Sequence, residues 1–216
     1  MILGPSLEIL VATRNPGKIR EIQQALLSLP INLRYLHEFP SISTINEIGR
    51  TYEENAVIKA LGYSRQTGLY SLADDSGLAV DALGGRPGVF SARFAGDHAS
   101  DSQRINKLLA ELSQHTEKER SARFVCYLAL VGWPKDLETL HTAKPGVLKV
   151  TEGRCEGLIT HAARGTNGFG FDPVFVPAGY DETFAELKNE VKATISHRAL
   201  ALRAMHAFLE RAFAQT

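Results

Sequence analysis

The chain has 216 residues, and its 24 lysines and arginines balance 24 aspartates and glutamates, so the formal net charge is zero. This balance argues against a general coat for nucleic acid, because covering a phosphate backbone takes a clustered excess of basic residues. Hydrophobic residues make up 44% of the chain, which is enough to bury a core in one domain of ordinary size. We expect a single domain over residues 1–216 that binds no nucleic acid.

The sequence gives no signal for a membrane partner. It has no run of about 18 apolar residues that could cross a bilayer. Gly4, Pro5 and Glu8 interrupt the first apolar run, whereas a secretory signal needs an unbroken one. The two cysteines, Cys126 and Cys155, lack C-x-x-C spacing, and so few thiols suit a reducing compartment. We expect a cytoplasmic protein.

Apolar periodicity predicts strands and helices mixed along the chain, which favours one α/β or α+β domain. Thr51 and Glu54 have capping-box spacing, which predicts a well-defined start for one helix. The glycine-rich residues 84–96 predict a long ordered loop. The predicted strands are residues 7–12, 31–36, 69–73, 78–83, 122–131, 147–151 and 154–159, and the predicted helices are residues 16–29, 52–65, 101–114 and the tail after Ser196.

Two common nucleotide-binding fingerprints are absent. A Walker loop is excluded because Ala12 and Ile19 stand where that pattern requires glycine and Ser/Thr. The Rossmann pattern is excluded because Pro173 takes the third glycine position and no helical pattern follows. Any nucleotide site in this chain must therefore be built differently.

Residues 13–18, Thr-Arg-Asn-Pro-Gly-Lys, form a polar loop between a predicted strand and a predicted helix. Backbone N–H groups at a helix N-terminus attract anions, and Thr13, Asn15 and Lys18 add side-chain donors. The alternative is a plain helix cap, with Asn15 as N-cap, Pro16 at the first helical position and Lys18 in solvent. Spacing alone favours the cap, since caps are far commoner than phosphate sites.

Acidic residues form a second group, with Glu47 before a helix and Asp74 and Asp75 in the run Asp-Asp-Ser-Gly after a predicted strand. Carboxylates at a strand end can hold Mg²⁺, which needs only one or two of them besides water and phosphate oxygens. A clustered carboxylate can also act as a general base toward water. The alternative is a simple turn, because Asp-Asp-Ser-Gly has ideal turn composition.

A glycine-rich segment over residues 165–173 contains Phe169 and Phe171. The glycines allow close approach of the backbone to a ligand, and the two phenylalanines offer stacking faces for a base. The alternative is a plain loop with core aromatics.

A basic group comprises Lys192, His197 and Arg198 around a helix start. Such a cluster opposes the helix dipole, which favours a bound anion. The alternative is that Ser196 is an N-cap and the basic side chains face solvent. Together the four groups fit one ligand, a nucleoside triphosphate.

Five ordered blocks between residues 12 and 202 closely resemble the inosine triphosphate pyrophosphatase family, the non-standard purine nucleoside triphosphate pyrophosphatases. The resemblance implies a single elongated α/β domain with a mixed sheet, flanking helices and a nucleotide cleft, in a homodimer. It also implies hydrolysis of ITP, dITP or XTP to the monophosphate and pyrophosphate with Mg²⁺, which cleanses the nucleotide pool. The blocks are ATRNPGK, the helix motif E-x-G-x-T-Y-x-E-N-A, ADDSGLAVDALGGRPGVFSARFAG, GFGFDPVF and SHRALAL.

The resemblance assigns roles by position. Asp75 matches the proton acceptor and metal ligand, and Glu47 and Asp74 are the further acids for the metal. The residues that match substrate contacts are Thr13, Asn15 and Lys18 in the phosphate loop, Ser76, the base-loop residues Phe169, Gly170, Phe171 and Asp172, and finally Lys192, His197 and Arg198.

Two departures from the family bear on the substrate. Relatives often have glycine at the position of Arg14, whose larger side chain either adds a phosphate contact or points to solvent. Phe171 replaces the commoner Tyr or Trp, which keeps stacking area and loses a polar handle. For base selection, we expect the donor to the 6-oxo group to be Arg198 or a backbone N–H of residues 169–172.

Two other functions remain open at this point. A non-catalytic nucleotide sensor would keep the pocket, although it would not need a water-activating carboxylate. A pyrophosphatase for modified pyrimidine or methylated nucleotides is the other alternative, because only the resemblance favours purines.

Overall fold

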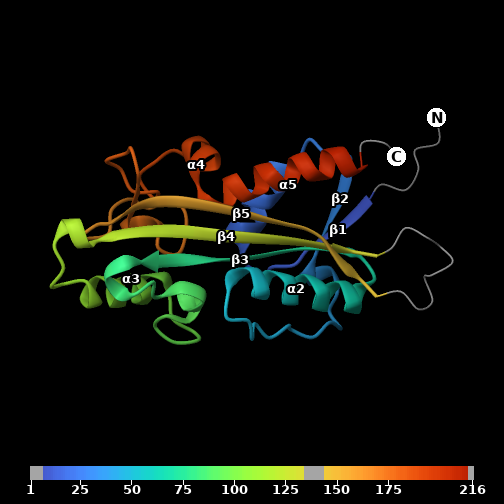
Figure 1. Ribbon diagram of the computed structural model, residues 1–216, viewed down its shortest axis with the longest axis horizontal. Coiled ribbons are helices and arrows are strands. Elements are labelled where there is room, and N and C mark those ends of the chain that lie inside the picture. Colours follow the sequence, from blue (N-terminus) through green and yellow to red (C-terminus); the bar gives the residue numbers. More distant parts are fainter. Residues whose placement is uncertain (1–6, 134–143, 214–216) are drawn as a thin grey trace. The chain divides into compact units, whose positions relative to one another are not determined.

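The alternation of apolar runs with amphipathic segments produces a mixed sheet of six strands flanked by helices (Figure 1), which confirms the expected α/β class. The computed structural model describes residues 7–133 and 144–213, apart from the side chains of Lys118 and Phe213. The sheet order is β2-β1-β3-β4-β5-β6. The strands are β1 (Leu7–Val11), β2 (Ile31–Tyr35), β3 (Tyr70–Val80), β4 (Ser121–Gly132), β5 (Gly146–Ile159) and β6 (Phe175–Pro177).

Pairing in the sheet is both parallel and antiparallel. Strand β1 is parallel to β2 and to β3, whereas β5 is antiparallel to β6. The carboxyl ends of β1 and β2 therefore lie at one edge, where loops of α/β proteins commonly bind ligands. The helices are α1 (Pro16–Leu26), α2 (Tyr52–Thr67), α3 (Asp101–Glu111), α4 (Asn189–Ile195) and α5 (His197–Phe213).

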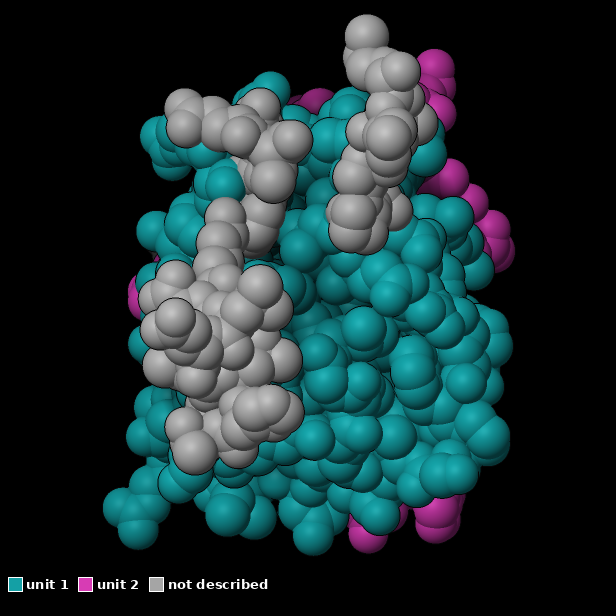
Figure 2. Space-filling view, turned by 90° about the vertical axis from the view of Figure 1, so that its right-hand side faces the viewer, with its two compact units in different colours: residues 1–75, 127–152, 201–216 teal, residues 76–126, 153–200 magenta. Residues whose placement is uncertain are grey.

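The chain divides into two compact units, coloured separately in Figure 2. Unit 1 comprises residues 1–75, 127–152 and 201–216, and unit 2 comprises residues 76–126 and 153–200. The division crosses β3 directly after Asp75. Each unit has its own hydrophobic core.

In unit 1, α2 packs an apolar stripe onto the sheet, and Figure 1 shows α2 and α5 on opposite sides of these strands. The predicted capping box of α2 is confirmed: Thr51 Oγ1 accepts from Glu54 N at 3.1 Å, and Glu54 Oε2 accepts from Thr51 N at 3.3 Å. The core residues of this contact are Ala56, Ala60 and Tyr63 of α2, Leu10, Ala73, Ala129 and Val131 of the strands, and Ala12 directly after β1.

In unit 2, aromatic side chains from separate segments form the centre of the core. Phe124 of β4 contacts Phe175 of β6 edge-on at 4.7 Å and lies 6.1 Å from Phe184, centroid to centroid. Arg120 is buried beside this core, and its guanidinium donates to the carbonyls of Leu112, Ile159 and Thr160. These bonds compensate the cost of burying its charge.

The prediction of a turn at residues 74–77 is wrong. Residues 70–80 form one continuous strand, β3, and residues 81–83 form a 3₁₀ turn rather than more strand. Turn composition is overridden because Asp74 and Asp75 are buried and have lysine partners elsewhere in unit 1. The two predicted strands at 147–151 and 154–159 likewise merge into β5.

Some elements differ in length or were missed. The first helix ends at Leu26 and α3 ends at Glu111, each earlier than predicted. The short elements β6 and α4 were not predicted from the sequence. The sequence also predicts one apolar stripe along the last helix, formed by Leu202, Met205, Leu209 and Phe213. The first three are buried, and the side chain of Phe213 lies outside the described residues. Within residues 7–133 and 144–213, no helix is long and apolar enough to cross a membrane.

Candidate active site

A buried lysine joins the acids of unit 1. Lys59 Nζ lies 3.0 Å from Glu47 Oε1 and 3.6 Å from Asp75 Oδ1. It also donates to the backbone carbonyl of Asp74 at 2.6 Å. Since Lys59 belongs to α2 and Asp75 to β3, this contact fixes the helix against the strand at the acidic residues.

The neighbouring carboxylate of Asp74 faces the other side of the sheet. Successive side chains of a strand alternate between faces, and Asp74 pairs with Lys18 of α1 rather than with Lys59. The predicted set of three carboxylates is thus divided between two lysines. Glu47 and Asp75 share Lys59, and Asp74 belongs to Lys18.

Burial changes the ionisation of this cluster. Burial raises the pKa of Asp75 above its usual value, although the charges of Lys59 and Lys18 act in the opposite direction. Burial lowers the pKa of Lys59, but the charges of Asp75, Glu47 and Asp74 outweigh that effect and raise it overall. The pKa of Tyr52 is raised by burial and then by the charge of Asp75. A carboxylate with a raised pKa is a better proton acceptor.

The acid cluster fits a hard metal ion such as Mg²⁺. Asp75 Oδ2 is buried and has no hydrogen-bond partner among the described residues, and buried polar atoms rarely stay without one. No group of three or more Asp, Glu, His or Cys side chains within the described part of the chain gathers as a metal site. Mg²⁺ needs only one or two carboxylates, which Glu47 and Asp75 can supply.

The loop at residues 13–18 is a helix cap in the structure. Asn15 Oδ1 accepts from the backbone N–H of Gly17 at 2.8 Å and of Lys18 at 3.2 Å, and Asn15 N donates to Thr13 Oγ1 at 3.2 Å. Most of the backbone donors expected for a phosphate are therefore engaged within the loop. Lys18 is not solvated, since it pairs with Asp74, and Arg14 is exposed.

In unit 2, the base loop is closed by the buried carboxylate of Asp172. Its Oδ2 accepts from Phe169 N at 2.9 Å and from Lys192 Nζ at 2.5 Å. Gly168 adopts φ +77°, which favours glycine. Gly170 N donates to Asp101 Oδ2 at 2.7 Å, which anchors the loop to the start of α3.

Two cations cover the ring of Phe169. Lys192 Nζ lies 4.8 Å and Arg198 Cζ lies 5.6 Å from the ring centroid. Arg198 also donates to Ser76 Oγ at 2.8 Å. Both basic side chains are buried, so the alternative of a solvated basic cluster is wrong.

Two other predicted contacts lie in the core. Phe171 is buried and packs edge-on against Phe94, so it presents no exposed stacking face, and the expectation of two stacking rings is wrong for this residue. His197 is buried and stacks on Phe124 with a centroid distance of 4.6 Å. Ser196 caps α5 by accepting from Ala199 N at 3.2 Å.

Sequence reasoning missed Lys59, Tyr52 and Asp101. Lys59 had a detectable signal, because it lies between Ala56 and Tyr63 on the buried stripe of α2. A lysine on an apolar helix face is buried only with a partner. Asp101 had no such signal, since its contact with the base loop joins residues far apart in sequence.

Known proteins resemble this chain over nearly its full length. The model of the Ham1 family matches residues 9–208. A protein of Bacillus anthracis named dITP/XTP pyrophosphatase is 45% identical over 91% of this chain and 93% of its own length. A protein of the same name from Bacillus licheniformis is 46% identical over 95% and 99%. The structure of a HAM1 protein from Coxiella burnetii superimposes with a TM-score of 0.82 at 42% identity, over 95% of this chain and 99% of the other.

Gly168→Ala should destabilise the protein by disrupting the contact between Asp172 and Lys192. An added Cβ would lie 2.0 Å from Asp172 Oδ2. Gly170→Ala is the matched control, because its φ is +65° and its Cβ would meet nothing within 4 Å. Both variants carry the strain of a positive φ. In urea unfolding, the free energy of unfolding should fall by at least about 1 kcal/mol more in Gly168→Ala than in Gly170→Ala. Equal decreases in the two variants would refute the contact.

Proposed function

The chain belongs to the Ham1 family, and from that premise we propose that it hydrolyses non-standard purine nucleoside triphosphates. The proposed substrates are dITP, ITP and XTP, and the products are the nucleoside monophosphate and pyrophosphate. Removing these nucleotides would cleanse the pool from which nucleic acids are made. The relatives named dITP/XTP pyrophosphatase support this substrate class.

The observation that carries the proposal is the environment of Asp75. It is a buried carboxylate with a raised pKa, a lysine partner, and one oxygen without a hydrogen-bond partner among the described residues. Such an oxygen is suited to accept a proton from an attacking water. In the proposed reaction, Asp75 orients and deprotonates that water, which needs no covalent intermediate.

Two lysines of unit 1, Lys18 and Lys59, would supply positive charge for the phosphates. Cleavage between the α and β phosphates develops negative charge on the phosphoryl oxygens and on the leaving pyrophosphate. Lys18 and Lys59 are the cations nearest the acids. Their positive charges would stabilise the negative charge that develops on the phosphates. Lys59 would also favour the ionised form of Asp75.

We propose Mg²⁺ as the cofactor, with Glu47 and Asp75 as its protein ligands. When bound, it would neutralise phosphate charge and lower the pKa of a bound water. Asp74 is less suited as a ligand, because its side chain points to the opposite face of β3 from Asp75 and pairs with Lys18 there.

Arg198 is the best candidate for the donor that recognises the 6-oxo group of the base. The two expected donors to a 6-oxo group were this residue and the backbone of residues 169–172. The N–H groups of Phe169 and Gly170 already donate to carboxylates, which favours the side chain of Arg198 beside the ring of Phe169. Adenine has an amino group at that position. Two hydrogen-bond donors, this amino group and the guanidinium of Arg198, would then face each other without an acceptor, which disfavours ATP.

The proposal includes a homodimer in the cytoplasm. The homodimer follows from the family resemblance and would be tested by sedimentation. Both cysteines are buried and form no disulfide within the described residues, and burial raises the pKa of the Cys155 thiol to about 11. Thiols kept in this form suit a reducing compartment.

The direct test is product analysis with a panel of nucleotides and Mg²⁺. We expect pyrophosphate and the monophosphate from dITP, ITP and XTP, with much slower turnover of dATP, dGTP, dUTP and TTP. A chelator should abolish turnover. Release of inorganic phosphate, or a preference for pyrimidines, would overturn the proposal. Tight binding of dITP without turnover would identify a nucleotide sensor instead.

Asp75→Asn should lose most of its turnover, because the change keeps the size of the side chain and removes the charge. Loss of a general base typically lowers the rate by about 10²- to 10⁴-fold. The measurement is kcat for dITP. A variant with near wild-type kcat would show that another group activates the water.

The same variant should remain folded and be at least as stable as the wild type at pH 7 without metal. The folded-state pKa of Asp75 is raised, so its protonated form contributes stability below the unfolded pKa of about 3.9 that is lost as pH rises through the folded pKa. Asparagine avoids that loss. In urea unfolding, the free energy of unfolding of Asp75→Asn should increase relative to that of the wild type as the pH is raised from acid to neutral. A relative loss over that interval would contradict the raised pKa.

A further inference from the structure

Three buried polar atoms of unit 1 have no hydrogen-bond partner among the described residues. They are the hydroxyl Oη of Tyr52, the amide Nδ2 of Asn55 and the carboxylate Oδ2 of Asp75. Tyr52, Asn55 and Lys59 are three and four residues apart in α2, so they share one face of the helix. That face meets β3 where Lys59 contacts Asp75. Since buried polar atoms rarely stay without a partner, we expect a small polar molecule to bind here.

The phenol of Tyr52 lies within the electrostatic influence of Asp75. Burial raises the pKa of Tyr52, and the charge of Asp75 raises it further. The hydroxyl therefore keeps its proton at neutral pH and can donate, whereas an ionised carboxylate oxygen can only accept. Neither atom has a partner, so the two do not bond to each other. A molecule that accepts from Tyr52 and donates to Asp75 would satisfy both, and water does so.

The backbone that carries Tyr52 is held firmly in place. Tyr52 is the first residue of α2, directly after the capping box of Thr51 and Glu54. Asn55 Oδ1 accepts from Gly49 N at 2.8 Å, which ties the preceding loop to the same turn. Gly49 has no room for a side chain, because an added Cβ would lie 2.7 Å from Asn55 Oδ1. A fixed first turn keeps the hydroxyl of Tyr52 in one position, as the orientation of a reactant requires.

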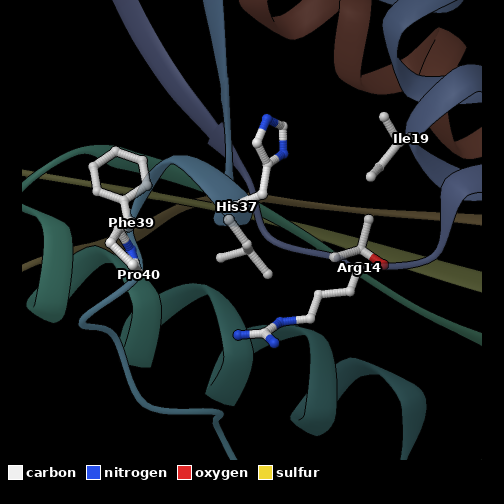
Figure 3. Close-up of a pocket in the computed structure, with 7 residues that line it drawn as sticks. Arg14, Ile19, His37, Phe39 and Pro40 are labelled. Carbon is white, nitrogen blue, oxygen red and sulfur yellow. The ribbon is translucent and has the colours of Figure 1, made fainter.

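The open pocket of unit 1 does not supply this molecule from bulk solvent. The pocket has a volume of about 380 Å³, and Figure 3 shows Arg14, His37 and Phe39 around it. Its described lining residues come from the segments 13–19 and 36–40, which belong to neither α2 nor β3. A water between Tyr52 and Asp75 would therefore be an ordered, buried one.

We propose that Tyr52 donates a hydrogen bond to the attacking water, which in turn donates to Asp75 Oδ2. The inference rests on the proposed function, since it adds a second protein partner for the water of that reaction. One lone pair of the water accepts from Tyr52, and the other forms the bond to the α phosphorus. The bond from that phosphorus to the bridging oxygen breaks, and its electron pair leaves with pyrophosphate. The proton of the water goes to Asp75, and Tyr52 keeps its own.

The kinetic test uses Tyr52→Phe, which removes only the hydroxyl. The kcat for dITP should fall by about three- to tenfold, the effect of one lost hydrogen bond. The KM and the Mg²⁺ concentration that gives half the maximal rate should stay unchanged. Tyr63→Phe is the matched control, because it removes a hydroxyl from the same helix at a residue of the apolar core, and it should keep the wild-type kcat.

Two kinetic results would overturn the inference. The first is a wild-type kcat in Tyr52→Phe. The second is a change confined to KM or to the Mg²⁺ requirement, which would assign the hydroxyl to the substrate or to the metal instead of the water.

A double-mutant cycle with Asp75→Asn distinguishes this role from a purely structural one. Once Asp75 no longer accepts the proton, the water loses its productive orientation, so adding Tyr52→Phe should lower kcat by at most about twofold more. An equal fold-loss with and without Asp75→Asn would show that Tyr52 acts independently of that water, against the inference.

Crystal structures of the metal-free wild type and of Tyr52→Phe give a readout that does not depend on turnover. A water within hydrogen-bond distance of both Tyr52 Oη and Asp75 Oδ2 should be present in the wild type and lost in the variant. Wild-type cleavage of dITP with no water at this position would remove the inference and keep the proposed function. The water in a protein that cleaves no nucleotide would keep the site and remove the function.

Discussion

The position of Lys59 is the constraint on which the acidic site depends. Its ammonium group is buried between the carboxylates of Glu47 and Asp75 and also binds the backbone of Asp74. A lone buried charge would cost several kcal/mol, so the burial of Lys59 requires a carboxylate partner, and Glu47 supplies one even when Asp75 is neutral. The buried ammonium of Lys59 therefore both holds α2 against β3 and influences the ionisation of Asp75. An acid that is buried and still kept near a cation has the properties that water activation requires.

The same principle explains why residues 74–77 continue a strand. In a strand, Asp74 and Asp75 point to opposite faces, so each acid can meet a lysine from a different helix, Lys18 of α1 or Lys59 of α2. A turn would lose both pairs. In unit 2 the carboxylate of Asp172 plays the corresponding part, because it holds both Lys192 and the backbone of the base loop.

The features that could be predicted from the sequence are those that depend on local chemistry. The starts of α1 and α2 follow from Asn15 and from the capping box of Thr51, which satisfy donors within one turn. The features that could not be predicted depend on distant partners. Whether Phe169 or Phe171 faces the core is decided by Phe94 and by Lys192, which no short pattern reveals. The resemblance to a known family indicated the site residues but not their division between two lysines.

Asp75 is a buried acid whose pKa is raised by burial, while the charge of Lys59 acts to lower it. The most direct test is a titration of its carboxyl carbon by ¹³C NMR in the metal-free protein and in Lys59→Met. We expect Asp75 to titrate above the usual value of about 3.9 in the wild type. It should titrate higher still in the variant, because the positive charge that stabilises its carboxylate has been removed. A pKa at or below the usual value, or one that does not change when Lys59 is replaced, would contradict it.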